Sequence, residues 1–216
     1  SAASDVYKRQ VGTFSWQKCL GGEAGHGILV LSPKAVERIN TYNPPWPIPK
    51  LFQLRKNGKL NLDIFSGATI NTPSMLCVED FLDALNWTRE VGGLSALISK
   101  SKNNLNIIKN WISDSHWADF LCEDVNNLSS TSICLKLVDP KIIDLPLETK
   151  NNIEKNIVKL LEDHKVAFDI GSYRSAPPGF RIWGGPTVEN DDVKNLLPWL
   201  DSVSYTHLRA HETASD

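Results

Sequence analysis

The stretch that decides the fold spans residues 13–27 and reads TFSWQKCLGGEAGHG. It places Lys18 between an aromatic run and a turn that contains four glycines. Glycine has no Cβ, so such a turn can adopt positive φ and approach a bound group closely. The apolar run 28–31 follows and ends at Ser32-Pro33, a pattern that predicts a buried strand. The stretch therefore predicts a lysine on a tight connection beside a sheet, where its amine can be held against a ligand.

The composition indicates a soluble, globular chain with no nucleic-acid partner. The 216 residues are 41% hydrophobic and 22% charged, and 23 basic residues oppose 25 acidic ones. The formal charge of −2 gives no attraction for a polyanion, although local basic groups suffice for small anions. No apolar run is long enough to cross a membrane and no signal-peptide pattern is present, so we expect no membrane partner.

Cysteine and histidine spacing indicates neither disulfides nor a metal. The cysteines lack CxxC spacing and the density of a disulfide scaffold: Cys19, Cys77, Cys122 and Cys134. A reducing compartment fits best, and we expect the cytoplasm. His116 and His164 have no companions at ligand spacing, so no metal site is predicted. His26 lies in the glycine turn, where we expect it to satisfy backbone groups.

Local patterns along the first half predict a helix, a hairpin and a second helix. Pro33 opens a short helix over residues 34–42. Asn57-Gly58, between the alternating segments 51–56 and 59–64, predicts a type I′ hairpin. Thr72 and Pro73 predict a helix cap followed by proline at the first helical position, with Gly92-Gly93 ending the helix.

The second half predicts a small α+β domain. A helix with apolar residues on one face runs from Leu94 to Ile112, and Ile133, Leu135 and Leu137 alternate along a strand. The remaining elements expected are a helix from about residue 149, strands 166–170 and 180–183, and a final helix broken or kinked at Pro198.

The glycine pair gives the expected domain boundary, and both ends of the chain look foreign to the fold because they lack apolar periodicity. We therefore expect four parts: a non-native or disordered tail over 1–10, a first domain over 11–92, a second over 93–203, and a non-native or disordered tail over 204–216.

Three motifs occur in order along the chain: Trp16-Gln17-Lys18 with the following glycines, the segment 70–75 (INTPSM), and Tyr173-Arg174 followed by 179–183 (GFRIW). Together they resemble phosphoserine aminotransferase, a pyridoxal-phosphate (PLP) enzyme family of the aspartate-aminotransferase fold. The resemblance runs from about residue 13 to residue 203. It implies an α/β chain that forms the C-terminal part of a fold-type I PLP-dependent transferase, with a remnant of the large PLP-binding domain and a small C-terminal α+β domain.

The resemblance assigns cofactor roles to four residues. Lys18 would form the Schiff base with PLP and move a proton at the substrate Cα, and Gln17 would contact the cofactor phosphate. Asn71 and Thr72 would reach the phosphate of the cofactor in the other subunit, which implies a homodimer with shared active sites. From the residues alone, an ordinary solvated lysine is the default interpretation of Lys18, and a helix cap is that of Thr72.

Substrate roles fall on the second half. Arg181 alternates with Phe180 and Ile182, so it leaves the opposite face of their strand, and the resemblance assigns it to the substrate α-carboxylate. The resemblance implies that Arg174 helps with substrate phosphate or carboxylate, although a surface arginine is the alternative reading. Tyr173 stands where the family commonly has histidine, which bears on recognition of the substrate phosphate.

The implied reaction exchanges an amino group between glutamate and 3-phosphohydroxypyruvate, giving O-phosphoserine and 2-oxoglutarate in serine biosynthesis. Two alternatives remain: a related alanine or serine–glyoxylate transaminase, or a non-catalytic domain. The second arises because the family's upstream part supplies the acid that pairs with the pyridine nitrogen, and too few residues precede Lys18 to hold it. We therefore expect a C-terminal fragment that is inactive alone.

Overall fold

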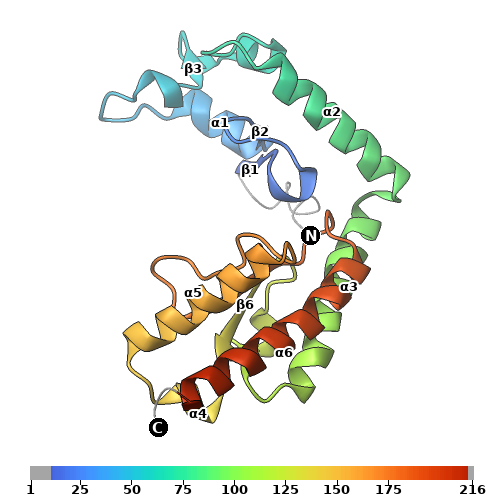
Figure 1. Ribbon diagram of the computed structural model, residues 1–216. Coiled ribbons are helices and arrows are strands. Elements are labelled where there is room, and N and C mark those ends of the chain that lie inside the picture. The colour runs from blue at the N-terminus through green and yellow to red at the C-terminus, as the bar shows by residue number, and fades with distance from the viewer. Residues whose placement is uncertain (1–10, 214–216) are drawn as a thin grey trace. The chain divides into compact units, whose positions relative to one another are not determined.

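The computed structural model describes the backbone of residues 11–213 and the side chains of residues 11–205. The chain falls into two compact units, residues 1–87 and 88–216, which divide within helix α2 (Met75–Glu90) (Figure 1). The expected boundary at Gly92-Gly93 lies just beyond this point and separates α2 from α3 (Gly93–Asp114). Both glycines have positive φ, 105° and 72°, as a sharp end to a helix requires.

The first unit begins with a β-hairpin that frames the lysine. Strand β1 (Val11–Ser15) pairs antiparallel with β2 (Gly27–Leu31), and the short 3-10 helix η2 (Lys18–Leu20) lies in their connection. Helix α1 (Pro33–Thr41) follows, because Ser32 Oγ accepts a hydrogen bond from Ala35 N at 3.1 Å and Pro33 occupies the first turn. The strand and the helix predicted here are confirmed, but the expected burial of the strand was wrong, because every residue of β2 is exposed or half-buried.

The predicted Asn57-Gly58 turn is also confirmed, but its strands are shorter than expected. Asn57 and Gly58 have φ of 53° and 78°, as a type I′ turn requires, and they join β3 (Arg55–Lys56) to β4 (Lys59–Leu60). The flanking residues form 3-10 helices instead, η3 (Lys50–Phe52) and η4 (Leu62–Ser66). The β3–β4 pair is instead bonded to α1, because Oδ1 of Asn40, a residue of α1, accepts a hydrogen bond from Leu60 N at 2.7 Å.

Helix α2 does not begin at the predicted cap. Its first residue is Met75, and Ser74 caps it: Ser74 Oγ accepts from Cys77 N at 3.4 Å, and Ser74 O accepts from Val78 N at 3.1 Å. The expectation that Thr72 caps the helix was wrong, because the serine nearer to the first turn supplies the acceptor. Thr72 and Pro73 lie in the irregular segment before it.

The second unit packs helices against an antiparallel sheet of three strands, ordered β5-β6-β7 (Figure 1). In chain order after α3 come β5 (Ala118–Phe120), η5 (Val125–Asn127), β6 (Ser132–Leu137), α4 (Pro140–Ile143), α5 (Leu147–Asp163), β7 (Gly179–Trp183) and α6 (Asn190–Thr213). The sheet's apolar face supplies Ile133, Leu135, Phe180 and Ile182 to one core. Helices α3, α5 and α6 supply the rest, which confirms the predicted α+β arrangement.

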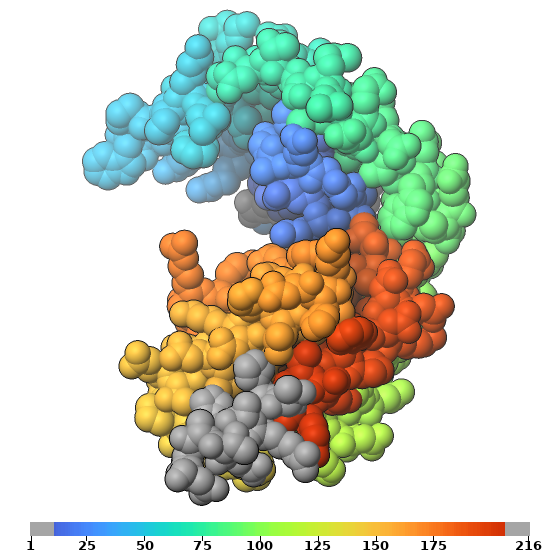
Figure 2. Space-filling view, in the orientation of Figure 1, coloured from blue at the N-terminus to red at the C-terminus, as the bar shows by residue number. Residues whose placement is uncertain are grey.

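Figure 2 shows the packed side chains of α3 (green) beside those of α6 (red) in this second unit. Ile108 of α3, Leu161 of α5 and Leu200 of α6 are completely buried where the helices meet the sheet. Asn104 of α3 is buried among them and donates to the carbonyls of Gly184, Gly185 and Val188. This amide therefore fixes the chain between β7 and α6.

Two expected features of the second unit differ from the structure. Residues 166–170 form no strand, because Lys165 and Asp169 adopt left-handed φ of 58° and 53° that interrupts an extended chain. Strand β5 was not predicted at all.

Helix α6 passes through Pro198 without a break, so the expected break was wrong, and its backbone continues to Thr213. The prediction that residues 204–216 are non-native concerns their origin and stays a prediction.

Candidate functional site

Lys18 lies on an exposed, tightly tethered turn. Its φ is 64°, a left-handed value that is uncommon for a residue with a Cβ. The turn is closed on both sides: Lys18 O accepts from Gly21 N at 2.9 Å, and Trp16 O accepts from Gly22 N at 2.8 Å. A Cβ on Gly22 would lie 2.8 Å from Trp16 O, so the close approach requires glycine. The predicted lysine on a tight connection is thus observed.

The aromatic residue beside Lys18 is turned toward the protein interior. Trp16 stacks on Phe81 of α2 with ring centroids 4.4 Å apart and on His26 at 5.0 Å. Neither aromatic side chain covers the lysine, because Lys18 is exposed and Phe14 is itself 51% exposed.

His26 connects the lysine turn to the start of α2. Its Nε2 accepts a hydrogen bond from Ser74 N at 3.3 Å, which confirms that this histidine satisfies a backbone group. Asn71 and Thr72 lie just before Ser74 and are exposed, and Asn71 O accepts from Thr69 Oγ1 at 2.7 Å. The residues assigned to the cofactor therefore all lie in the first unit. His26 joins the turn that carries Lys18 to the start of α2, next to Asn71 and Thr72.

Gln17 and Cys19 flank the lysine. Gln17 N donates to Ser15 Oγ at 3.2 Å, so the hairpin fixes the residue that precedes Lys18. Burial raises the pKa of the Cys19 thiol above its ordinary value, although a backbone hydrogen bond opposes this. The thiol is consequently kept protonated, and Lys18 is the more exposed side chain of this pair.

Arg181 is the most constrained of the predicted substrate residues. Its side chain leaves β7 on the face opposite Phe180 and Ile182, as predicted, and is 18% exposed. The Nη2 atom donates to Asp169 Oδ2 at 2.9 Å and to Asp169 O at 3.3 Å. The guanidinium carbon lies 4.1 Å from the centre of the Tyr173 ring. Its Nε is buried and has no hydrogen-bond partner among the described residues.

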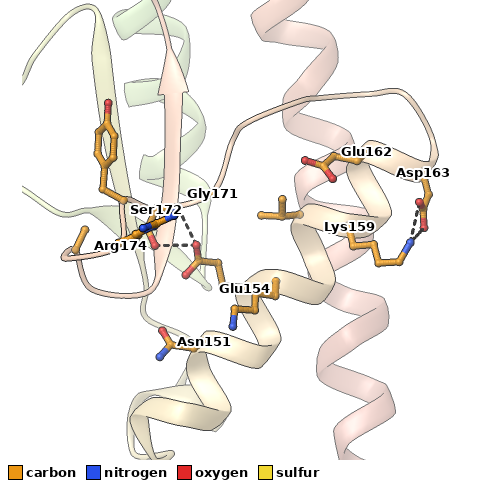
Figure 3. Close-up of a pocket in the computed structure, with 12 residues that line it drawn as sticks. Asn151, Glu154, Lys159, Glu162, Asp163, Gly171, Ser172 and Arg174 are labelled. Carbon is orange, nitrogen blue, oxygen red and sulfur yellow. Dashed lines mark hydrogen bonds and ion pairs between the residues drawn. The ribbon is translucent and has the colours of Figure 1, made fainter.

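Tyr173 and Arg174 belong to a loop that borders a pocket of about 710 Å³ with helix α5 (Figure 3). Both side chains are exposed, and a turn at Tyr173 is closed by a 2.9 Å hydrogen bond from Ala176 N to Tyr173 O. The structure therefore groups Tyr173, Arg174 and Arg181 in the second unit. Among the described residues, no group of three or more His, Cys, Asp or Glu side chains is arranged to hold a metal ion.

Glu154 is a residue of this region that the sequence did not single out. It lies on α5 and is 7% exposed, and it accepts hydrogen bonds from the loop that carries Tyr173 and Arg174. The sequence does contain an indication of it, because an acidic residue adjoins the apolar stripe formed by Ile153 and Ile157. Its partners, however, lie far along the chain.

Comparison with solved structures gives the fold. The structure matches phosphoserine aminotransferase from Bacillus circulans subsp. alkalophilus with a TM-score of 0.69 and 19% identity, over 94% of this chain and 49% of that one. A PLP-bound phosphoserine aminotransferase from Trichomonas vaginalis matches over 65% of this chain with a TM-score of 0.54 and 16% identity. The fold is therefore that of the C-terminal part of a PLP-dependent transferase.

Sequence comparison is more specific. The chain is 49% identical over 195 residues to phosphoserine aminotransferase from Methanosarcina mazei, covering 90% of this chain and 50% of that protein. No family model matches. The chain spans about half the length of the curated relatives it matches. The resemblance to the C-terminal part of phosphoserine aminotransferase, indicated by the three motifs, is confirmed.

Proposed function

We propose that the protein to which this chain belongs is a phosphoserine transaminase. It exchanges an amino group between glutamate and 3-phosphohydroxypyruvate, producing O-phosphoserine and 2-oxoglutarate for serine biosynthesis. The observation that carries this proposal is the 49% identity to the Methanosarcina mazei enzyme over 90% of the chain. The presence of a constrained arginine on β7 and an exposed lysine on a glycine-dependent turn supports it.

The first unit fits PLP as cofactor. The Lys18 amine is accessible on a turn whose backbone is fixed on both sides, and Gln17 is held next to it. Asn71 and Thr72 are exposed close to the N-terminus of α2, where amide and hydroxyl groups suit a phosphate. When bound, PLP supplies an electron sink for the substrate Cα. Lys18 would hold the cofactor and then move the proton at that carbon.

The second unit supplies groups that suit an acidic substrate. A planar guanidinium on a rigid strand is well suited to the α-carboxylate, and Arg181 presents such a group from β7. Arg174 and Tyr173 would recognise the remaining phosphate or carboxylate from their exposed loop. Arg181 then orients the amino acid, and Arg174 favours substrates with a second negative charge.

We further propose a homodimer in which Asn71 and Thr72 contact the cofactor of the partner subunit. A reducing cytoplasm is the proposed location, with which the free state of Cys19, Cys77, Cys122 and Cys134 agrees. Among the described residues, no helix has the length and apolar character needed to cross a bilayer.

The decisive experiment maps the cofactor lysine. The full-length protein is incubated with PLP, reduced with borohydride and digested, and the pyridoxyl group is expected on Lys18. Lys18→Arg should abolish labelling and turnover, whereas Lys34→Arg, at another exposed lysine of the same unit, should leave both intact. Label on a different lysine would reject the assignment.

Substrate choice needs a separate comparison, because Tyr173 replaces the histidine common in the family. Turnover of O-phosphoserine should exceed that of serine and alanine. A preference for serine or alanine, which lack the phosphate, would instead indicate an alanine or serine–glyoxylate transaminase. The same assays on the 216-residue chain test whether it is non-catalytic, and stoichiometric PLP binding with turnover would reject that alternative.

A further inference from the structure

Glu154 is a buried carboxylate whose hydrogen bonds all come from one loop. It is 7% exposed on α5, and a charged group in such a place must be compensated by donors. Oε1 accepts from Ser172 N at 2.7 Å and from Ser172 Oγ at 2.8 Å, and Oε2 accepts from Gly179 N at 3.2 Å. Figure 3 shows the carboxylate directed toward the loop and bonded to Ser172.

These bonds join the two ends of the loop that carries Tyr173 and Arg174. Ser172 immediately precedes the pair, and Gly179 begins strand β7. The approach is close, since a Cβ on Gly171 would lie 3.3 Å from Glu154 Oε1. One side chain on a helix therefore fixes both points from which the loop leaves the packed core.

Backbone bonds also hold the loop, from Ala176 N to Tyr173 O and at the bridge between Gly171 and Phe180, but they do not pack the aromatic side chain. Tyr173 is 61% exposed, yet its ring lies 4.1 Å from the Arg181 guanidinium. Core packing cannot account for this position, because most of the ring faces solvent. The backbone of Ser172, fixed by Glu154, determines where the Tyr173 side chain begins.

We propose that Glu154 is a positioning residue for substrate recognition. By fixing Ser172 and Gly179, its carboxylate holds Tyr173 over Arg181 and presents Arg174 at the pocket. Glu154 itself does not touch the substrate. This inference rests on the proposed function, in which Arg181 and Arg174 bind the acidic groups of the amino acid.

The experiment compares Glu154→Ala and Glu154→Gln with wild type by two readouts. The first is amide hydrogen exchange in the 216-residue chain. Glu154→Ala should raise the exchange rates of Ser172 and Gly179 about tenfold or more, because both N–H groups lose a buried acceptor. In Glu154→Gln the amide oxygen can still accept hydrogen bonds from Ser172. The NH₂ group that faces Gly179 cannot accept one, so amide exchange should rise mainly at Gly179.

The second readout is steady-state kinetics of the full-length protein. Glu154→Ala should raise the KM for O-phosphoserine about tenfold, equivalent to about 1.4 kcal/mol, and change kcat by less than about twofold. Glu154→Gln should recover part of the KM. The matched control is Glu148→Gln, an exposed glutamate on the same helix that is not among the residues lining the pocket, which should change neither readout.

Three results would overturn the proposal. The first is unchanged amide exchange at Ser172 and Gly179. The second is a uniform rise of exchange throughout α5 and β7, which would indicate that Glu154 supports the fold in general. The third is a decrease of kcat with no change in KM. If Glu154→Ala does not fold, Glu154→Gln and Ser172→Ala carry the test, since each removes only part of the bonding. Failure of wild type to label Lys18 or convert phosphoserine would reject the proposed function instead, and the exchange data would still report on the loop.

Discussion

Replacement of Asp169 by asparagine should strengthen binding of the substrate carboxylate. In the structure Asp169 Oδ2 pairs with Arg181 Nη2 at 2.9 Å, so an internal carboxylate engages the guanidinium that we assign to the substrate. Asn is the right replacement because Asp169 has φ of 53°, a conformation that asparagine tolerates and alanine does not. The substitution removes the competing charge without adding backbone strain.

The magnitude follows from the exposure of the pair. Asp169 is 91% exposed and Arg181 18% exposed, so solvent screens the interaction from one side. Pairs of this kind contribute about 0.5–1 kcal/mol, which corresponds to about twofold to fivefold in an equilibrium constant. We therefore expect the KM for glutamate to fall about twofold to fivefold in Asp169→Asn, and the gain to shrink as salt rises.

The assay is the initial rate of the full-length protein as a function of glutamate at low and high ionic strength. Asp191→Asn serves as control, since Asp191 also forms an exposed ion pair in the second unit, with Lys194. That variant should leave the KM unchanged. A KM that rises or stays constant in Asp169→Asn would refute the view that this aspartate competes with substrate for Arg181.

Three further predictions concern stability and thiol reactivity. Gly179→Ala should lower the free energy of unfolding by about 2–4 kcal/mol in urea titrations, because its Cβ would lie 2.0 Å from Leu135 O in the β6–β7 ladder. Asn104→Ala should cost about 2–4 kcal/mol in the same assay, because it removes a completely buried amide that donates to three carbonyls, and the exposed Asn103→Ala should cost far less. Burial raises the pKa of the Cys19 thiol above its ordinary value, so the folded chain favours the thiol over the thiolate, and stability should fall as pH rises past the ordinary pKa of cysteine. Iodoacetamide should accordingly label Cys19 more slowly in the folded chain than in urea at pH 8, and equal rates would contradict this.

Features that depend on neighbouring residues were predictable from the sequence. The Asn57-Gly58 turn, the alternation along β6 and the outward direction of Arg181 each follow from local φ preferences or side-chain periodicity. The cofactor and substrate assignments came from the family resemblance and remain predictions for individual residues.

Other features were not predictable from apolar periodicity and cap preferences. Ser74 caps α2 in preference to Thr72, and the segment ending at Ile170 is irregular because Lys165 and Asp169 take left-handed conformations that apolar periodicity does not reveal. Glu154 was missed because it depends on a distant partner, since Ser172 is 18 residues away along the chain. Sequence patterns indicate which face of an element is buried, but they do not identify the donor that compensates a buried charge.

The irregular segment before β7 also protects the sheet. Strand β7 is the last strand in the order β5-β6-β7, and an unpaired edge of this kind can pair with another chain and promote aggregation. Here Ile170 O accepts from Arg181 N at 2.8 Å, and Gly171 forms an isolated bridge with Phe180. The strand that presents Arg181 is therefore protected from intermolecular pairing along this segment, and variants that release the segment should aggregate before they lose their helices.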